Sequence, residues 1–263
     1  MRSPGADLAL AIAAVRAAGD IAMSFFGKDF RRWEKAPGDP VSEADLAVDA
    51  ALTATLRTAR PDDGLVSEET ATDPDQLSRA RVWIIDPIDG TRAFLKGKPH
   101  FTVCAALLVA GETRAGVVYN PATGELFAAE SGAGATLNGA PIRASDRDAL
   151  EGCRMLGDAG MFRHPAWRLP WPDMEIEARN SIAYRIALVA CGAFDATLAL
   201  SAKRDWDLAA ASLIASEAGA RITDHRGDPL RFLTPGLSLP AVAASGERLH
   251  PLLIERTHTV RLP

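Results

Sequence analysis

Two carboxylates that could take part in catalysis stand three residues apart, directly after an apolar run that predicts a buried strand over residues 82–85. Asp86 and Asp89 lie in an Asp-Pro and an Asp-Gly step, which are strong turn signals. A helical turn that begins after Gly90 would point free backbone N–H groups at the space between the carboxylates. Ligands for a hard cation beside donors for an anion suit a metal-bound phosphate. Ordinary surface turns use the same dipeptides, so the rest of the chain must decide between the two interpretations.

Three further carboxylates stand at the ends of expected elements. Asp45 lies in the first turn of a helix predicted from residue 42, Glu68 follows a short strand over 65–67, and Asp207 precedes a helix over 208–219. Helix capping explains Asp45 and Asp207 as well as a catalytic role does, and Glu68 beside Glu69 is typical of a solvated loop. These interpretations stay open for each residue taken alone.

A convergence of the five carboxylates would require cations, because like charges a few ångströms apart cannot all stay ionised. Carboxylate and carbonyl oxygens suit Mg²⁺, Mn²⁺ or Ca²⁺, and the chain lacks the Cys and His spacing of a zinc site. Two such ions about 3.5–4 Å apart activate water and stabilise a leaving oxygen. The expected chemistry is hydrolysis of a phosphate ester, with the metals allowing a negative protein to bind a negative substrate.

Composition excludes several other functions. The net charge of −5 and the pI near 5.6 argue against binding of a nucleic-acid polymer, which needs a basic face. The sequence contains no 18-residue apolar run, so no membrane span is expected. The N-terminus lacks a secretory pattern, and three widely spaced cysteines indicate no disulfide framework, so a cytoplasmic location is expected. The partner is then a small phosphorylated metabolite.

The chain predicts alternating helices and strands and two domains, over 1–145 and 146–263, with Asp207 in the second. Residues 112–142 predict an antiparallel meander, because Asn-Gly and Asn-Pro turns separate short apolar runs. Polar stretches over 71–81 and 164–172 predict loops. Helices are expected over 7–26, 42–60, 181–193, 208–219 and 249–256, and other strands over 101–109, 153–156, 194–200, 221–223 and 239–244.

Four motifs in the same order resemble the inositol monophosphatase family of magnesium-dependent, lithium-sensitive phosphatases. They are Asp-Pro-Val-Ser-Glu-Ala-Asp at 39–45, Ser-Glu-Glu at 67–69, Asp-Pro-Ile-Asp-Gly-Thr at 86–91 and Trp-Asp-Leu-Ala-Ala at 206–210. The resemblance extends over residues 6–227. It implies an α/β fold, a layered α/β/α/β/α sandwich of two domains with the site between them. Homodimers are common in the family.

The resemblance also implies roles for individual residues. It assigns two or three Mg²⁺ ions, replaceable by Mn²⁺ or Ca²⁺, to one set of ligands and gives a second set to catalysis, in which Asp45 and Thr91 orient the attacking water. The implied metal ligands are Glu68, Asp86, the carbonyl of Ile88, Asp89 and Asp207; the implied catalytic residues are Asp45, Glu68 and Thr91; the implied substrate-binding residues are Asp89, Gly90, Thr91, Ser181, Ala183, Arg185 and Lys203.

The resemblance leaves the substrate open. The inositol phosphatases carry a glutamate seven residues before the last aspartate, where this chain has Leu200, and that weakens an inositol phosphate assignment. A second phosphate would be suited by four cationic residues, Arg92, Arg185, Lys203 and Arg204. Lys203 and Arg204 could equally form a solvated loop. The sequence of residues 91–97 and 181–184 resembles that of the bacterial 3′(2′),5′-bisphosphate nucleotidases. Adenosine 3′,5′-bisphosphate is therefore the first expected substrate.

Two other interpretations stay open. Histidinol phosphate and inositol 1-phosphate are the alternative substrates, since the Thr-Arg-Ala-Phe segment at 91–94 also occurs in relatives that hydrolyse histidinol phosphate. A non-catalytic, metal-binding regulatory protein on the same scaffold is the alternative from a different class. Loss of Thr91, Glu68 or one of the aspartates would indicate such a protein, and none of them is lost.

Overall fold

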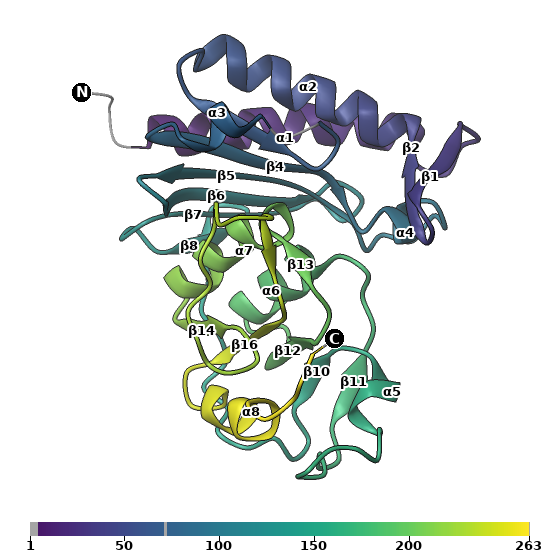
Figure 1. Cartoon of the computed structure of the whole chain (residues 1–263), viewed down its shortest axis with the longest axis vertical. Helices are drawn as coiled ribbons and strands as arrows, with labels where there is room; N and C mark the ends of the chain where they lie inside the picture. The colour runs from purple at the N-terminus through teal and green to yellow at the C-terminus, as the bar shows by residue number, and fades with distance from the viewer. Residues whose placement is uncertain (1–4, 71–72, 263) are drawn as a thin grey trace.

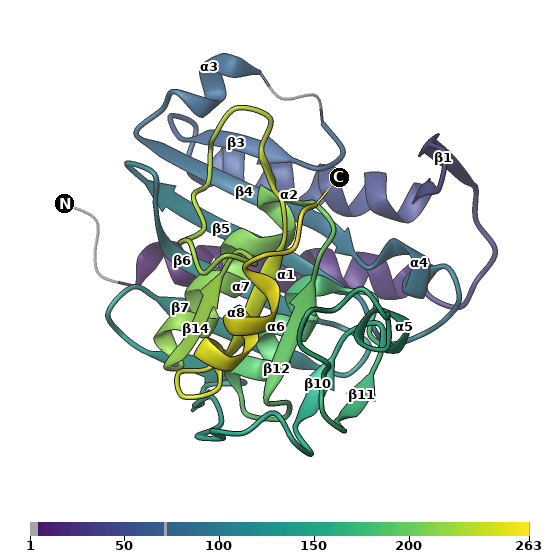
Figure 2. The ribbon, with the colours of Figure 1, turned by 60° about the horizontal axis from the view of Figure 1, so that its bottom comes forward.

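The computed structural model describes residues 5–70 and 73–262. The chain forms five layers (Figure 1). Helices α1 (Ala6–Phe25) and α2 (Glu43–Ala59) cover one face of a seven-stranded sheet, and α6 (Ile182–Ala190) and α7 (Asp205–Glu217) lie between that sheet and a five-stranded one. Helix α8 (His250–Thr257) covers the outer face of the five-stranded sheet, as Figure 2 shows. The predicted α/β/α/β/α sandwich is confirmed.

The seven-stranded sheet follows the chain order from β3 to β9. Only β3 and β4 are parallel, and every later neighbour is antiparallel, as the predicted meander requires. Parallel pairing matters for the site because the carboxyl ends of β3 and β4 then meet at one edge. The strands are β3 (Gly64–Ser67), β4 (Arg81–Asp89), β5 (Thr102–Val109), β6 (Glu112–Asn120), β7 (Glu125–Glu130), β8 (Ala135–Leu137) and β9 (Ala140–Pro141).

Alternation along the central strands separates two apolar cores. In β4, Trp83 and Ile85 pack towards α1 and α2, whereas Val82 and Ile84 pack towards α6 and α7. Both faces of the sheet are therefore buried, which explains why the sequence of β4 is continuously apolar rather than alternating. Helix α1 is long and apolar enough to cross a membrane by length and composition alone, and its buried face packs in the core beneath α2.

The five-stranded sheet has the order β11-β10-β12-β16-β14, and two-stranded sheets pair β1 with β2 and β13 with β15. The inner face of the five-stranded sheet belongs to the same apolar cluster as α6, α7 and one face of the seven-stranded sheet. This core therefore includes residues from both predicted domains. The division at residue 145 stays a prediction. The remaining elements are β1 (Arg32–Ala36), β2 (Asp39–Ser42), α3 (Pro74–Leu77), α4 (Thr91–Phe94), β10 (Arg154–Leu156), α5 (Ala159–Phe162), β11 (Glu175–Glu177), β12 (Ala196–Ala199), β13 (Lys203–Arg204), β14 (Ala220–Thr223), β15 (Ser238–Leu239) and β16 (Val242–Gly246).

The structure corrects the sequence-based elements at several places. The strand expected over 239–244 is interrupted at residues 240 and 241, so β15 and β16 belong to different sheets. Strand β4 continues through the Asp-Pro step to Asp89 instead of ending at residue 85. Its pairing with β5 is interrupted after Asp86 and resumes at Asp89. The expected loop over 71–81 contains the short helix α3, with Asp73 as its N-cap; residues 71 and 72 lie outside the described residues. Helix α7 begins at Asp205 rather than residue 208, which moves Asp207 into its first turn.

Candidate active site

A bulge at the end of β4 brings Asp86 and Asp89 to one face of the sheet. Asp86 pairs with Cys104 and Asp89 pairs with Thr102, so three steps along β4 match two steps along β5. In a regular strand, residues three apart point to opposite faces, and the extra residue reverses the alternation. Ile88 accordingly packs in the core under α1 and α2, and both carboxylates face the layer of α6 and α7.

Asp207 reaches the same point from the first turn of α7. One carboxylate oxygen of each of Asp86, Asp89 and Asp207 lies within 4.8 Å of the others. The Asp207 Oδ2 accepts a hydrogen bond of 2.8 Å from the backbone N–H of Arg204, which fixes the side chain at the helix start. The seven-stranded sheet and the helix layer beneath it therefore converge on a cluster of three carboxylates.

Electrostatics disfavour charge on all three groups. Burial, reinforced by the negative charges of Glu68, Asp89 and Asp207, raises the pKa of Asp86 well above its ordinary value. Burial also raises the pKa of Asp89 to about 6, although hydrogen bonds from Ser181 and Ala183 lower it. The pKa of Asp207 rises to about 7 because of burial and the charge of Asp89. A divalent cation would remove the repulsion and restore the ionised forms.

The Asp86 side chain is the strongest sign that the cluster suits a metal. Both of its carboxylate oxygens are buried, and neither has a hydrogen-bond partner within the described part of the chain. Buried carboxylates without donors are costly unless they bind a cation. The donor set contains only oxygen, which is the set that Mg²⁺ and related hard cations prefer.

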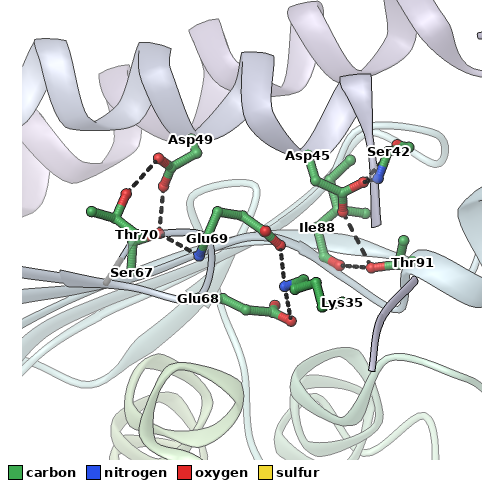
Figure 3. Close-up of polar contacts among 10 residues, drawn as sticks. All are labelled: Lys35, Ser42, Asp45, Asp49, Ser67, Glu68, Glu69, Thr70, Ile88 and Thr91. Carbon is green, nitrogen blue, oxygen red and sulfur yellow. Dashed lines mark hydrogen bonds and ion pairs between the residues drawn. The ribbon is translucent and has the colours of Figure 1, made fainter. Parts of the chain in front are cut away.

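Glu68 follows β3 and approaches the cluster from the neighbouring strand end, where its charge acts on Asp86, Asp89 and Asp207. The Nζ of Lys35 on β1 lies 3.1 Å from Glu68 Oε1 and 2.7 Å from Glu69 Oε1 (Figure 3). Burial lowers the pKa of Lys35, but the two glutamates outweigh it and raise that pKa to about 12. Burial raises the pKa of Glu69 to about 7.

Asp45 and Thr91 form a second polar group beside the cluster (Figure 3). Asp45 Oδ2 accepts hydrogen bonds from the backbone N–H and the hydroxyl of Ser42, at 2.8 and 2.6 Å. The Thr91 hydroxyl lies 3.2 Å from Asp45 Oδ1 and 3.1 Å from the carbonyl oxygen of Ile88. Asp45 therefore caps α2, as the structural interpretation expected, and also contacts Thr91. Burial raises the pKa of Asp45 above its ordinary value.

Ser181 and Ala183 at the start of α6 hold Asp89 in place. The Ser181 hydroxyl donates to Asp89 Oδ2 at 2.5 Å and the Ala183 backbone N–H donates to it at 2.7 Å. Gly90 permits this approach, because its φ is +96° and a Cβ there would lie 2.7 Å from the His100 carbonyl oxygen and 3.1 Å from the Ser181 backbone nitrogen. The turn after β4 and the start of α6 therefore depend on glycine at position 90.

A cavity of about 880 Å³ opens over the cluster. The sequence-predicted residues that line it are Glu68, Asp89, Arg92, Arg185, Lys203, Arg204 and Asp207. A smaller recess of about 180 Å³ beside it is lined by the predicted residues Gly90 and Thr91 and has Asp39, Arg92 and Asn180 in common with the main cavity. Asp45, Asp86, Ser181 and Ala183 lie behind this surface and position its members.

Arg185 and Lys203 carry positive charge to the far wall. The Arg185 guanidinium donates to Thr197 and to two carbonyl oxygens, those of Leu156 and Leu198, and burial lowers its pKa to about 10. The Lys203 Nζ donates to the Ser201 hydroxyl at 2.7 Å. Burial lowers the pKa of Lys203 too, against the charge of Asp207. The alternative interpretation of Lys203 and Arg204 as a solvated loop is wrong for Lys203. The two residues form strand β13, and of the two only Arg204 is exposed.

Sequence reasoning missed several residues of the site. Lys35 and Glu69 form the ion pair at its edge, and Asp39, Asp158, Asn180 and Trp206 line the main cavity. The hairpin of β1 and β2 carries Lys35, and its only sequence signal was the turn-rich stretch over 36–40. A charged side chain that reaches across from a hairpin leaves no periodic pattern, so the pairing with Glu68 becomes visible only in three dimensions.

Comparison with known proteins agrees with this arrangement. The sequence model of the inositol monophosphatase family matches residues 6–262. A Nus factor SuhB of Vibrio cholerae is 34% identical over 231 residues, with 84% of this chain and 85% of the relative covered. A histidinol-phosphatase of Chlorobaculum parvum is 34% identical over 227 residues, covering 84% and 86%. The solved structure of a Thermotoga maritima IMPase superposes with a TM-score of 0.83 at 29% identity, over 95% of each chain.

The family match extends over nearly the whole chain, and the two relatives exceed 30% identity over most of their own length. The chain therefore belongs to the inositol monophosphatase family of metal-dependent phosphoric monoester hydrolases.

Proposed function

We propose that this protein hydrolyses a small phosphomonoester with water at the cluster of Asp86, Asp89 and Asp207. The observation that carries the proposal is the convergence of these buried carboxylates, with both oxygens of Asp86 lacking a donor among the described residues. Together with Glu68 and the carbonyl of Ile88, these side chains would hold two or three Mg²⁺ ions, with Mn²⁺ or Ca²⁺ as replacements. When bound, the ions supply charge neutralisation and lower the pKa of water.

Asp45 and Thr91 would orient the attacking water. The Thr91 hydroxyl has one proton, which it donates to Asp45 Oδ1 or to the Ile88 carbonyl oxygen, so its lone pairs stay available to accept from a water molecule. The water oxygen forms a bond to phosphorus, and the ester P–O bond breaks on the opposite side. The leaving alcohol takes up a proton and the water loses one, which the carboxylates can accept. Glu68 would assist in activating the water.

The remaining predicted residues would bind the substrate. Backbone N–H groups of Gly90 and Thr91 face the phosphate in this proposal, and Asp89, held by Ser181 and Ala183, meets the sugar or alcohol side. Arg185 and Lys203 line the cavity wall opposite the cluster and would attract a second negative group. The absence of a carboxylate at Leu200 removes an acceptor that a polyol would need.

Adenosine 3′,5′-bisphosphate is accordingly the first proposed substrate, with AMP as the product. Histidinol phosphate is the second candidate, favoured by the likeness to the Chlorobaculum parvum histidinol-phosphatase; inositol 1-phosphate is the third. A comparison of kcat/KM for the three, with and without Mg²⁺, tests the ranking. Faster hydrolysis of inositol 1-phosphate than of both others would overturn the substrate assignment, and phosphate release in chelator at the Mg²⁺ rate would overturn the chemistry.

A regulatory role is the competing function, favoured by the likeness to a relative named as a Nus factor. Inertness of the purified protein on a broad phosphomonoester panel with Mg²⁺ would favour it. Inhibition by Li⁺ belongs to the hydrolase proposal, and insensitivity at high Li⁺ would count against the proposed metal arrangement. A homodimer and a cytoplasmic location stay predictions, to be checked by sedimentation and by cell fractionation.

A further inference from the structure

A second cavity adjoins the main one, and none of the acidic cluster lines it. It has a volume of about 490 Å³ and is lined by the segment around α5 and by the chain that follows α8. Met161 and Leu200 line both cavities, so these side chains form the boundary between them. The second cavity has the size of a small-molecule site. Figure 1 shows the C-terminal segment running back from α8 towards this region.

The wall of this second cavity is apolar and held in place. Trp167 lines it, and its indole Nε1–H donates to the carbonyl oxygen of Met161 at 2.6 Å. The Trp167 ring packs edge-on against Trp171, at 5.2 Å between ring centroids, and Trp171 packs in the same manner against Phe162 at 4.9 Å. Both edge-to-face contacts are favourable arrangements for aromatic rings. The indole is therefore positioned before any ligand arrives, which limits the entropic cost of binding.

Polarity divides the two cavities. The first contains the acidic cluster and the cations Lys35, Arg185 and Lys203, whereas Met161, Trp167, Leu200 and Val260 give the second an apolar interior with arginines at its edge. The ester group of a phosphate bound at the carboxylates would lie in the main cavity, whose wall includes Met161 and Leu200 at the boundary with the second cavity. A polyol there would lose its water without gaining partners, whereas a flat aromatic ring would bury its faces.

We propose that the second cavity is a subsite for an aromatic ring in the leaving group of the substrate, with Trp167 and Leu200 as its specificity-determining residues. The proposal deepens the proposed function and rests on it, because it places the phosphate at the acidic cluster. It names a substrate class: phosphomonoesters of alcohols that carry an aromatic heterocycle. A nucleobase and an imidazole both meet this description, and a cyclitol does not.

Pairs of alkyl phosphates with and without a phenyl ring test the subsite. The pairs are 2-phenylethyl and ethyl phosphate, 3-phenylpropyl and propyl phosphate, and 4-phenylbutyl and butyl phosphate, each assayed with Mg²⁺. The alcohols within a pair are similar leaving groups, so the ratio of kcat/KM reports ring binding. Burial of one ring stabilises by about 1.5–3 kcal/mol, so the best pair should show a ratio of roughly 10 to 100.

Two variants and one control locate the ring. Trp167→Ala and Leu200→Asn should each lower the ratio of the best pair by about tenfold, since one removes the wall and the other makes it polar. Leu169→Ala is the matched control, because Leu169 belongs to the same segment, is exposed and does not line the cavity. Thermal unfolding of each variant shows that the fold is retained.

The outcomes separate the subsite from the identity of the substrate. A ratio near one for every pair, or a high ratio that Trp167→Ala and Leu200→Asn leave unchanged in folded protein, overturns the subsite. A high ratio that falls in both variants and not in Leu169→Ala supports it, even if adenosine 3′,5′-bisphosphate is not hydrolysed, which would overturn only the nucleotidase assignment. Hydrolysis of adenosine 3′,5′-bisphosphate with a ratio near one overturns the subsite and leaves the phosphatase proposal standing.

Discussion

The acidic cluster and the polar group around His250 are both buried, but their partners differ. His250 on α8 lies 2.9 Å from the Thr223 hydroxyl through Nε2 and 3.3 Å from the Ser245 hydroxyl through Nδ1, so both ring nitrogens have a neutral partner. Asp86 has two buried oxygens, no donor within the described chain and further carboxylates around it. Neutral, satisfied polar groups add to stability, whereas like charges held together cost stability and mark a place where a ligand is required.

The largest effect is expected for Asp89→Asn. Asparagine keeps an oxygen that accepts from Ser181 and Ala183, so the fold should be retained, but it removes one charged metal ligand. Loss of several kcal/mol of transition-state stabilisation corresponds to a fall in kcat on the order of 10³-fold. Steady-state kinetics with Mg²⁺ and circular dichroism measure the two parts. Near-normal turnover would show that Asp89 has no such role.

Thr91→Ala should lower kcat by about 10²-fold with little change in KM, because loss of the hydroxyl that orients the attacking water acts on the chemical step. Thr91→Ser keeps the hydroxyl that faces Asp45 and should recover most of the activity. Equal activities of the alanine and serine variants would mean that the hydroxyl does not orient the water.

Mg²⁺ should stabilise the protein because it binds only the folded carboxylate cluster. At about 100 times its dissociation constant, the gain in unfolding free energy is about 2.7 kcal/mol, seen as a rise of several degrees in Tm over protein in chelator. In chelator, the free energy of unfolding of Asp86→Asn should exceed that of wild type by about 1 kcal/mol, since an amide can donate to the neighbouring carboxylates. If Asp86→Asn were less stable than wild type in chelator and still gained stability from Mg²⁺, the acidic cluster would not cost stability as proposed.

Lys203→Met should raise KM for adenosine 3′,5′-bisphosphate by about tenfold, because the second phosphate loses one charge-assisted hydrogen bond. The KM for a monophosphate should change less. The exposed Lys96, which does not line the cavity, provides the control Lys96→Met. An equal rise in KM for both substrates would indicate that Lys203 contributes only to the general potential of the cavity.

The smallest effect concerns His250, where burial and the charge of Arg221 lower the pKa to about 4. Between pH values of about 6.5 and 4 the unfolded state binds the proton and the folded state does not, so stability falls with falling pH. From pH of about 7.5 to about 5.5 the loss is about 1 kcal/mol. The buried carboxylates with raised pKa values act in the opposite direction, and they act equally in both proteins. Urea unfolding at the two pH values should therefore show that wild type loses about 1 kcal/mol relative to His250→Gln, with activity unchanged at neutral pH.

Sequence patterns predicted most of the helices and strands, because periodicity and turn chemistry are local, whereas the layered sandwich followed from the family resemblance. The structure brings Asp86, Asp89 and Asp207 together, and the roles of the site residues stay predictions. The apolar run of β4, the capping of α2 and the meander over 112–142 are each properties of neighbouring residues. Three features depended on contacts between distant segments: the bulge before Asp89, the reach of Lys35 to Glu68, and the cavity between α5 and the C-terminal segment. Such features follow from how elements pair, and a single strand or hairpin does not encode them alone.

The bulge at the end of β4 has a consequence for how the chain tolerates length changes. Deletion of one residue between Asp86 and Asp89 would remove the bulge that places the Ile88 carbonyl oxygen beside the Thr91 hydroxyl. The two carboxylates, then two positions apart in a regular strand, would still share a face. Such a deletion should therefore lower activity through the group around Thr91, while the mostly exposed segment over 163–170 can change length without moving the acidic centre.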